Sequence, residues 1–378
     1  MGTGNTCGNE GNNFNNATAS LTQSVATQSS ANLATSASPS IFGQSVTFTA
    51  TVTPVSPATG TPTGTVNFYD GAKGATCSAL GSSVWIGAQT ASGGSASVST
   101  SNLTAGSHGI LACYQGSSSF AASGGTRSQL VNQATPAITW STPAGITYGT
   151  ALSATQLNAN ATYQSGGSPA TVAGTFTYTP AAGTILSAGS QTLSVHFVPA
   201  DATDFATPVD KTVTLNVQTV SLTPSITASN KTYDGTTAAT FTCSLSGVVG
   251  IDVVSCTGGT AVFASVAAGT GTTVMATGLQ LTGAKSANYT LVSTTAATTA
   301  NIGAKSLTIS GVTAADKVYD GTLIATLNAA SATLQGVVPV DASLVTLQSG
   351  AKAGLFADKN VGVGGQRFRI HAFGCERR

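Results

Sequence analysis

The chain of 378 residues holds few side chains that could perform acid–base, nucleophilic or metal chemistry. Its three histidines, His108, His196 and His371, are widely separated in the sequence, and no Cys-x-x-Cys pair is present. Catalytic triads and metal sites need several such side chains in one place. The sequence therefore predicts no catalytic residues, no metal site and no cofactor. Asp201 and Asp204 offer two carboxylates for Ca²⁺, which needs six to eight oxygen ligands.

The carboxylates that most resemble a catalytic pair belong to a repeated phrase. It reads Lys-Thr-Tyr-Asp-Gly-Thr at residues 231–236 and Lys-Val-Tyr-Asp-Gly-Thr at residues 317–322. Equivalent aspartates of successive repeats cannot form one acid–base pair, whereas Asp-Gly is typical of turns, where the carboxylate accepts backbone N–H groups. We therefore expect six turn residues: Tyr233, Asp234, Gly235, Tyr319, Asp320 and Gly321.

The same order of segments follows each copy of the phrase. A Gly-Val-Val-x-x-Asp segment comes next, at residues 247–252 and 336–341, and then Phe-Ala, at residues 263–264 and 356–357. Self-similarity at a fixed period indicates an array built from one unit. We therefore expect consecutive copies of one domain in this half of the chain.

Composition excludes several classes of partner. Charged residues make up 7% of the chain and the net charge is +1, against about 25% charged residues in ordinary proteins. Nucleic-acid binding needs a clustered basic face, and anionic membranes attract polybasic segments. The chain has neither, nor an apolar run long enough to span a bilayer. We predict no nucleic-acid partner and no membrane insertion in this segment.

Period-two alternation predicts strands throughout. Residues 46–52 place Val and Phe on one face and Thr on the other, and residues 64–71 repeat this pattern before an Asp70-Gly71 pair that favours a hairpin turn. Val and Thr are abundant, whereas the residues of long helices are scarce. The predicted fold is all-β: tandem antiparallel β-sandwich modules.

The domain organisation follows from the pattern and its interruptions. Expected are a flexible segment at 1–39, sandwich modules at 40–133, 134–217 and 218–302, an incomplete module at 303–365, and an aberrant disordered tail at 366–378. Four of five arginines fall in the last twelve residues, which fits a shifted reading frame or a fragment end better than a basic functional tail. Without its final strands, the last module should expose apolar residues at Val318, Leu323 and Leu334.

Two cysteines of the third module have spacing that fits a disulfide. A hairpin turning at Val249-Gly250 would place Cys243 directly opposite Cys256, and cross-strand Cβ atoms about 4.5–5.5 Å apart can close such a bond. The alternative is two small buried thiols.

Three stretches resemble known families of bacterial repeat domains. Residues 44–133, with GTVNFYDG and LTAGSHGILACY, resemble a bacterial immunoglobulin-like repeat. Residues 134–217 are similar to the MBG-type immunoglobulin-like repeat, and residues 226–302 and 309–364 resemble the YDG domain of bacterial surface proteins, carrying KTYDGT, SANYTL and FADKNVG. The resemblance implies an immunoglobulin-like fold in secreted or surface-anchored, adhesin-like proteins. It also implies a disulfide between Cys77 and Cys113.

These observations favour a spacer or stalk, not an enzyme. Its expected partners are neighbouring domains of a longer chain, and its expected location is extracellular or on the cell surface, although the chain shows no signal peptide. The alternative is a module that binds a surface glycan or protein through loops at the end of a sandwich. Trp85, Trp140 and the tyrosines of the repeated phrase could stack on sugars if they are exposed.

Overall fold

A computed structural model describes residues 25–71, 74–347, 353–357, 368–370 and 375–377. Regular structure in these residues is almost entirely β-strand, with two 3-10 helical turns, η1 (Ser286–Asn288) and η2 (Pro339–Asp341). Most neighbouring strands pair antiparallel. The all-β fold with sandwich modules that the alternation predicts is thereby confirmed.

The chain divides into two compact units. The first comprises Met1–Pro143, Leu152–Thr184 and Thr192–Thr214, and the second comprises Ala144–Ala151, Ile185–Gln191 and Leu215–Arg378. We refer to four modules by their order along the chain, at residues 25–132, 133–218, 219–303 and 304–377. The second module contributes strands to both units.

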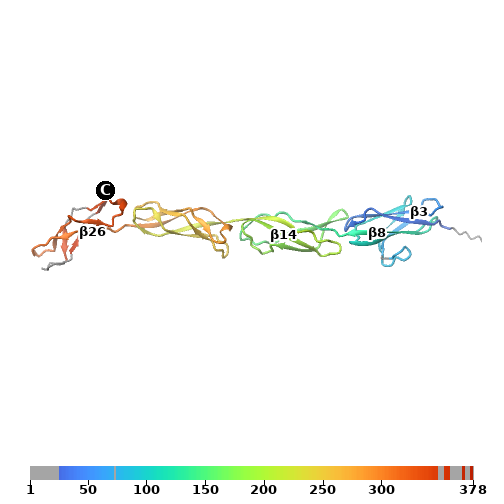
Figure 1. Cartoon of the computed structure of the whole chain (residues 1–378), viewed down its shortest axis with the longest axis horizontal. Helices are drawn as coiled ribbons and strands as arrows, with labels where there is room; N and C mark the ends of the chain where they lie inside the picture. Colours follow the sequence, from blue (N-terminus) through green and yellow to red (C-terminus); the bar gives the residue numbers. More distant parts are fainter. Residues whose placement is uncertain (1–24, 72–73, 348–352, 358–367, 371–374, 378) are drawn as a thin grey trace, which may run out of the picture. The chain divides into compact units, whose positions relative to one another are not determined.

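The first module is a sandwich of two sheets (Figure 1). One sheet has the order β1-β3-β6 and the other β2-β8-β7-β4-β5. Phe48 of the first sheet and Phe68 of the second are fully buried in one shared core. The strands are β1 (Ser29–Thr35), β2 (Ser40–Ile41), β3 (Val46–Pro54), β4 (Gly64–Gly71), β5 (Val84–Ala91), β6 (Ser95–Thr100), β7 (Gly106–Tyr114) and β8 (Ser123–Asn132).

Two expectations about the first module are corrected. The segment expected to be flexible contains β1, which pairs with β3 along its whole length and buries Leu33; residues 1–24 lie outside the described residues. Asp70-Gly71 is not a hairpin turn, because β4 runs through both residues and Gly71 pairs with Gly109 of β7. Ladder hydrogen bonds to β7 therefore override the local turn preference.

The second module contains seven strands. In the first unit, β13 pairs antiparallel with β14 and β11 pairs with both β9 and β12. In the second unit, β10 pairs in parallel with the end of β15. The strands are β9 (Ala137–Thr139), β10 (Ile146–Thr147), β11 (Asn160–Ser165), β12 (Ser168–Thr171), β13 (Gly174–Thr179), β14 (Gly189–Pro199) and β15 (Lys211–Gln218).

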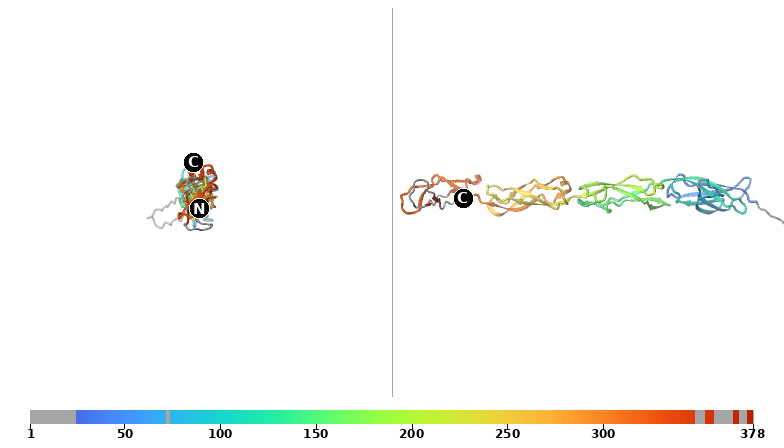
Figure 2. Two further views of the ribbon diagram at one scale, coloured as in Figure 1. Left: turned by 90° about the vertical axis from the view of Figure 1, so that its left-hand side faces the viewer. Right: turned by 90° about the horizontal axis from the view of Figure 1, so that it is seen from below.

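The third module has everything that an independently folding domain needs. Its sheets β19-β16-β24, β17-β25-β22-β21-β18 and β20-β23 pair only among themselves, and one cluster of buried residues extends from Ile226 to Ile302. The right-hand view of Figure 2 shows its strands, in yellow and orange, from a further direction. The strands are β16 (Val220–Ala228), β17 (Lys231–Thr232), β18 (Ala238–Ala239), β19 (Phe241–Ser246), β20 (Ser255–Thr257), β21 (Thr260–Phe263), β22 (Gly269–Thr277), β23 (Gln280–Thr282), β24 (Tyr289–Leu291) and β25 (Thr295–Gly303).

The fourth module is described in part. Part of the tail expected to be disordered at 366–378 forms two short strands that pair with earlier ones, β32 with β31 and β33 with β30; residues 366–367, 371–374 and 378 lie outside the described residues. Backbone groups at the edges of β30 and β31 gain ladder partners in this way. The strands are β26 (Thr308–Ser310), β27 (Thr313–Ala314), β28 (Ile324–Asn328), β29 (Thr333–Gln335), β30 (Val345–Leu347), β31 (Ala353–Phe356), β32 (Phe368–Ile370) and β33 (Cys375–Arg377).

Candidate functional site

One lysine holds the Tyr-Asp-Gly turn of the third module. Nζ of Lys231 donates to Oδ1 of Asp234 at 2.8 Å and to the carbonyl oxygen of Thr236 at 2.7 Å. The same Oδ1 accepts the backbone N–H of Thr236 at 2.9 Å. The hydrogen bond from Lys231, and then that from Thr236, lower the pKa of Asp234 to about 2. The carboxylate of Asp234 thus accepts hydrogen bonds from groups within the turn.

The fourth module repeats this turn. Nζ of Lys317 donates to Oδ1 of Asp320 at 2.6 Å and to the carbonyl oxygen of Thr322 at 2.9 Å. Hydrogen bonds from Lys317 and from the Thr322 N–H lower the pKa of Asp320 to about 2. Each ammonium also lies over a ring, Lys231 5.4 Å from the centroid of Phe263 and Lys317 5.9 Å from that of Phe356. The two aspartates therefore serve separate turns of the same design.

Three modules place an aromatic residue directly after a short strand that pairs in parallel with the module's last strand. The short strands are β2, β10 and β17, and their partners are β8, β15 and β25. The backbone N–H of each aromatic residue donates at 2.8 Å to the carbonyl oxygen at the end of the last strand: Phe42 to Asn132, Tyr148 to Gln218 and Tyr233 to Gly303. This bond fixes each ring where the next module begins. A glycine with positive φ follows closely in each case: Gly43, Gly149 and Gly235.

At the junction of the first and second modules, inside the first unit, the contact is aromatic. The ring of Phe42 stacks on Tyr163 with centroids 5.5 Å apart and meets Phe205 edge-on at 5.2 Å. Asp204, which is buried, accepts the backbone N–H of Ala105 from the first module at 2.6 Å. Aromatic pairs of this kind contribute about 0.5–1.5 kcal/mol beyond area burial.

At the junction of the second and third modules, inside the second unit, the contact is a shared carboxylate. The hydroxyl of Tyr148 donates to Oδ2 of Asp252 at 2.8 Å, and the hydroxyl of Tyr289 donates to the same oxygen at 2.6 Å. The two rings meet edge-on with centroids 5.5 Å apart. A Cβ atom on Gly149 would lie 2.9 Å from a methyl carbon of Val249. Glycine is therefore needed for the close approach.

The charges at this junction favour an ionised aspartate between two protonated tyrosines. Hydrogen bonds from Tyr289 and then Tyr148 lower the pKa of Asp252. Burial, together with the bond to Asp252, raises the pKa of Tyr289 to about 12 and also raises the pKa of Tyr148. The hydroxyls of Tyr148 and Tyr289 therefore stay protonated, and Asp252 stays ionised, over a wide pH range.

The junction of the third and fourth modules repeats this arrangement. The hydroxyl of Tyr233 donates to Oδ2 of Asp341 at 2.5 Å. A Cβ atom on Gly235 would collide with a methyl group of Val340 and lie 3.1 Å from one of Val338. Both Gly-Val-Val-x-x-Asp segments thus meet the Tyr and Gly of the preceding module. The sequence signal was present in the repeated segment, but nothing in it assigned a role to Asp252 or Asp341.

A disulfide joins Cys77 to Cys113 in the first module, with the Cα atoms 5.5 Å apart. Cys77 comes from the connection between β4 and β5, and Cys113 lies on β7. Gly124 of β8 is the ladder partner of Cys113, and a Cβ atom there would lie 2.6 Å from Sγ of Cys77. The missing side chain at Gly124 leaves the space that the bond occupies.

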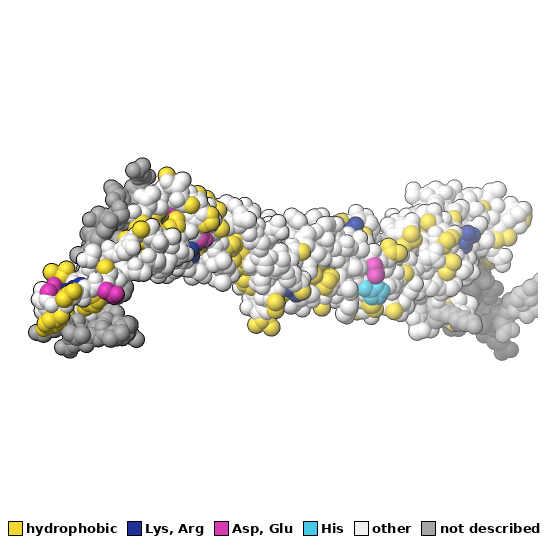
Figure 3. All heavy atoms as spheres, turned by 60° about the vertical axis from the view of Figure 1, so that its left-hand side comes forward, with side chains coloured by type: hydrophobic (Ala, Val, Ile, Leu, Met, Phe, Trp, Pro, Cys, Tyr) yellow, Lys and Arg dark blue, Asp and Glu magenta, His cyan; other side chains and the backbone are white. Residues whose placement is uncertain are grey.

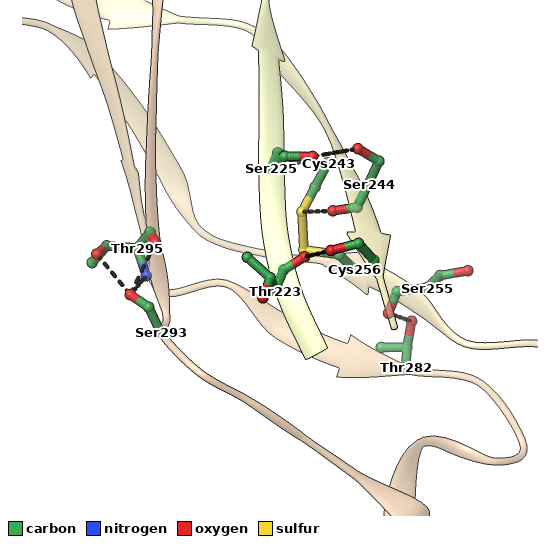
Figure 4. Close-up of a disulfide and its surroundings, with 10 residues drawn as sticks. Thr223, Ser225, Cys243, Ser244, Ser255, Cys256, Thr282, Ser293 and Thr295 are labelled. Carbon is green, nitrogen blue, oxygen red and sulfur yellow. Dashed lines mark hydrogen bonds between the residues drawn. A yellow bond between two sulfur atoms is a disulfide. The ribbon is translucent and has the colours of Figure 1, made fainter. Parts of the chain in front are cut away.

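The other disulfide joins Cys243 to Cys256, with the Cα atoms 5.6 Å apart (Figure 4). The expected hairpin is wrong, because Cys243 lies on β19, which pairs with β16, and Cys256 lies on β20, which pairs with β23. The bond therefore links strands of two different sheets. Beside it, the hydroxyls of Ser225 and Ser244 are 2.7 Å apart across the β16–β19 ladder.

The remaining candidates have local partners. Nδ1 of His108 lies 2.8 Å from Asp70, and Nδ1 of His196, on the exposed face of β14, lies 2.6 Å from Asp210; His371 lies outside the described residues. Asp201 accepts the backbone N–H groups of Thr203 and Asp204. No group of three His, Cys, Asp or Glu side chains in the described ranges could hold a metal ion.

The two tryptophans differ in exposure. Trp140 is buried and donates from Nε1 to the carbonyl oxygen of Gln156 at 3.0 Å. Trp85 is 54% exposed and meets Tyr69 edge-on with centroids 5.2 Å apart, beside the exposed Val84. Of the two tryptophans, Trp85 alone has a ring open to a ligand; of the tyrosines in the repeated phrase, Tyr319 is also exposed.

Comparisons with known proteins identify part of this architecture. The first module matches the bacterial Ig-like domain (group 3) over residues 33–132, and the YDG domain matches residues 209–298 and 303–372. No curated protein matches the chain. Among solved structures, the three N-terminal domains of the bacteriophage RB49 Highly Immunogenic Outer Capsid protein (Hoc) align at 10% identity and a TM-score of 0.21, covering 74% of this chain and 100% of that one.

The family matches agree with two of the three resemblances seen in the sequence. The immunoglobulin-like and YDG assignments are supported, whereas no MBG-type match covers residues 134–217. Among the described residues, no helix has the length and apolar character to cross a membrane. The chain thus contains one region that matches the group 3 bacterial Ig-like domain and two regions that match the YDG domain.

Proposed function

We propose that the chain is a non-catalytic spacer segment of a secreted or cell-surface bacterial protein of adhesin type. The observation that carries this proposal is the bonded junction: Tyr148 with Asp252, and Tyr233 with Asp341. Direct contacts between consecutive modules limit bending, which a spacer needs and an independent string of domains lacks. The partners of such a segment are the neighbouring domains of a longer chain.

The outer faces of the sheets support the same role. Hydroxyl side chains bond in pairs across the ladder of β3 and β6, Thr47 with Ser99 at 2.8 Å and Thr49 with Ser97 at 2.9 Å. Figure 3 shows a face on which charged side chains are few and scattered. A surface coated with hydroxyls offers little for strong association. The two disulfides fit an oxidising, extracellular location.

Force spectroscopy of the chain held by its two ends tests the spacer. The third module should unfold in one event. Reducing its disulfide should increase the chain length released in that event by about 45 Å, because the bond keeps 13 residues of about 3.5 Å each from extending. The first disulfide, which closes 36 residues, should withhold about 125 Å by the same arithmetic. Extension without resistance peaks would show that the chain does not bear load.

A second candidate function rests on Trp85. Its exposed ring, next to Tyr69, is the kind of surface that stacks on sugars or on an apolar side chain. A glycan and peptide binding screen of the intact chain decides between the two functions. Saturable binding that Trp85→Ala abolishes and Trp140→Phe leaves intact would favour the binding module over the spacer.

A further inference from the structure

The two Tyr-Asp-Gly turns have the same internal structure but different surroundings. Both have the lysine bound to the aspartate and to the following threonine, and the glycine φ values are +80° at Gly235 and +74° at Gly321. In the first copy, the Tyr hydroxyl and the glycine face the next module's Gly-Val-Val-x-x-Asp segment. The second copy therefore already has the conformation that the first copy uses for contact.

The second copy has an open face. Tyr319 is 62% exposed and Val318 is 90% exposed. No atom of the described residues lies within 4 Å of the position that a Cβ atom would take on Gly321, whereas at Gly235 Val340 and Val338 lie against that position. The difference lies in the neighbour, not in the turn.

We propose that Tyr319 and Gly321 form a docking surface for the Gly-Val-Val-x-x-Asp segment of another YDG module. The hydroxyl of Tyr319 donates to the aspartate of that segment, as Tyr233 does to Asp341. A valine methyl group of the segment fits over Gly321, as Val340 does over Gly235. This inference rests on the proposed role of the junctions as couplings between successive modules.

The same segment meets the same kind of surface twice in this chain. Asp252 with Val249 contacts Tyr148 and Gly149, and Asp341 with Val340 contacts Tyr233 and Gly235. The two receiving surfaces differ in sequence, Tyr-Gly in one and Tyr-Asp-Gly in the other. Recognition therefore depends on the Tyr hydroxyl and the glycine, and Tyr319 with Gly321 supplies both.

Affinity between separate molecules should be weak. The contact consists of one hydrogen bond to a carboxylate and one methyl contact, on a turn that its lysine has already ordered. Within one chain a short linker supplies an effective concentration of roughly millimolar, which makes a weak contact sufficient. Between chains, binding should therefore appear in the millimolar range, where NMR titration detects it.

The isolated third module is a suitable probe, because its sheets, core and disulfide are complete within residues 219–303. Removed from Tyr148, its Asp252 segment is open. Titrating the ¹⁵N-labelled module with the unlabelled intact chain should shift the amide signals of residues 247–252 in a saturable way. Tyr319→Ala in the intact chain should weaken binding at least tenfold, and Asp252→Asn in the module should do the same. Circular dichroism checks that both variants keep their fold.

Tyr69→Phe in the intact chain, which removes a tyrosine hydroxyl of the first module, is the matched control and should leave the titration unchanged. Absence of shifts at residues 247–252 overturns the proposal. So does a response lost with Tyr233→Phe and retained with Tyr319→Ala, since the probe would then be displacing the fourth module. Neither result bears on the spacer, which is tested by extension under force.

Discussion

The hydroxyl of Tyr148 and the carboxylate of Asp252 are 104 residues apart in sequence and 2.8 Å apart in space. Each belongs to a different module, and the hydroxyl of Tyr289, in the third module, donates to the same oxygen of the carboxylate. The bond therefore connects two domains through a group that one of them has already oriented.

Replacing this tyrosine should loosen the junction without unfolding either module. Tyr148→Phe keeps the ring contact with Tyr289 and removes only the bond to Asp252. In ¹⁵N relaxation of the intact chain, the third module should show a shorter rotational correlation time in the variant. Tyr69→Phe, which removes a hydroxyl far from any junction, is the control and should change nothing. Equal relaxation in the wild type and Tyr148→Phe would show that this bond does not couple the modules.

The junction should weaken only at the extremes of pH. The pKa of Asp252 is lowered in the folded state, so its contribution is complete above the ordinary Asp pKa of about 3.9 and is lost as pH falls through the lowered value. The pKa of Tyr289 is raised to about 12, so its contribution is complete below about pH 10 and is lost as pH rises toward 12. Relaxation should therefore be constant from about pH 4 to about pH 10 and should change only outside that range. A change near pH 6 or 7 would contradict this assignment.

The turn aspartates should titrate well below ordinary aspartates. Asp234 and Asp320 both have a pKa near 2 because a lysine donates to each. Carboxyl ¹³C chemical shifts should therefore remain those of the ionised form at pH 3. Lys231→Met should return the pKa of Asp234 toward its ordinary value and leave Asp320 unchanged, which provides an internal control. A normal pKa for Asp234 in the wild-type chain would mean that the turn is not formed in solution.

A bulky side chain at position 124 should block one disulfide. Gly124→Val places carbon atoms where Sγ of Cys77 lies, so Cys77 and Cys113 should be recovered as thiols in non-reducing mass mapping. The peptide linking Cys243 to Cys256 should persist in the same sample. In the chain-entropy model, each disulfide stabilises the folded state by about 3 kcal/mol or more. The first module of the variant should therefore melt at a lower temperature. An intact Cys77–Cys113 peptide in the variant would mean that the strand shifts to make room.

The fourth module should be the first to yield to protease. Val318 and Ile324 are 90% and 63% exposed, and Leu323 is also exposed. The equivalent positions of the third module carry the smaller or polar residues Thr232, Ala238 and Thr237. Limited proteolysis should leave a fragment that ends near residue 302. The third module, with its disulfide, serves as the comparison within the same digest. Equal resistance of the two modules would show that the strands at the end of the chain complete the fourth one.

Local pattern predicts strands well where one face is buried. Val46, Phe48 and Val52 all point into the core of the first module, as their spacing requires. The same reasoning failed at Asp70-Gly71, because pairing with β7 decides the conformation there. It also misjudged the surroundings of Cys243 and Cys256, since the choice of ladder partner is made by strands distant in sequence.

The contacts at the junctions could not be predicted from the local sequence pattern, for a similar reason. A hydrogen bond between Tyr233 and Asp341 depends on how two modules meet, and neither alternation nor turn preference contains that information. Repetition was the available clue, since the Tyr-Asp-Gly phrase and the Gly-Val-Val-x-x-Asp segment recur in a fixed order. The repetition indicated that the two segments are parts of one repeating unit. It did not indicate that Tyr233 contacts Asp341.

The junction has a direction that bears on how such genes change. The third module contacts the following module through Tyr233, which donates to Asp341, and the preceding module through Asp252, which accepts from Tyr148. A head-to-tail contact of this kind joins two different surfaces, so each module can contact the next one in the same way. Duplication or loss of one whole module therefore still places a junction tyrosine of one module next to a junction aspartate of the following module. Recombination between repeats can lengthen or shorten the protein in single-module steps without any compensating substitution.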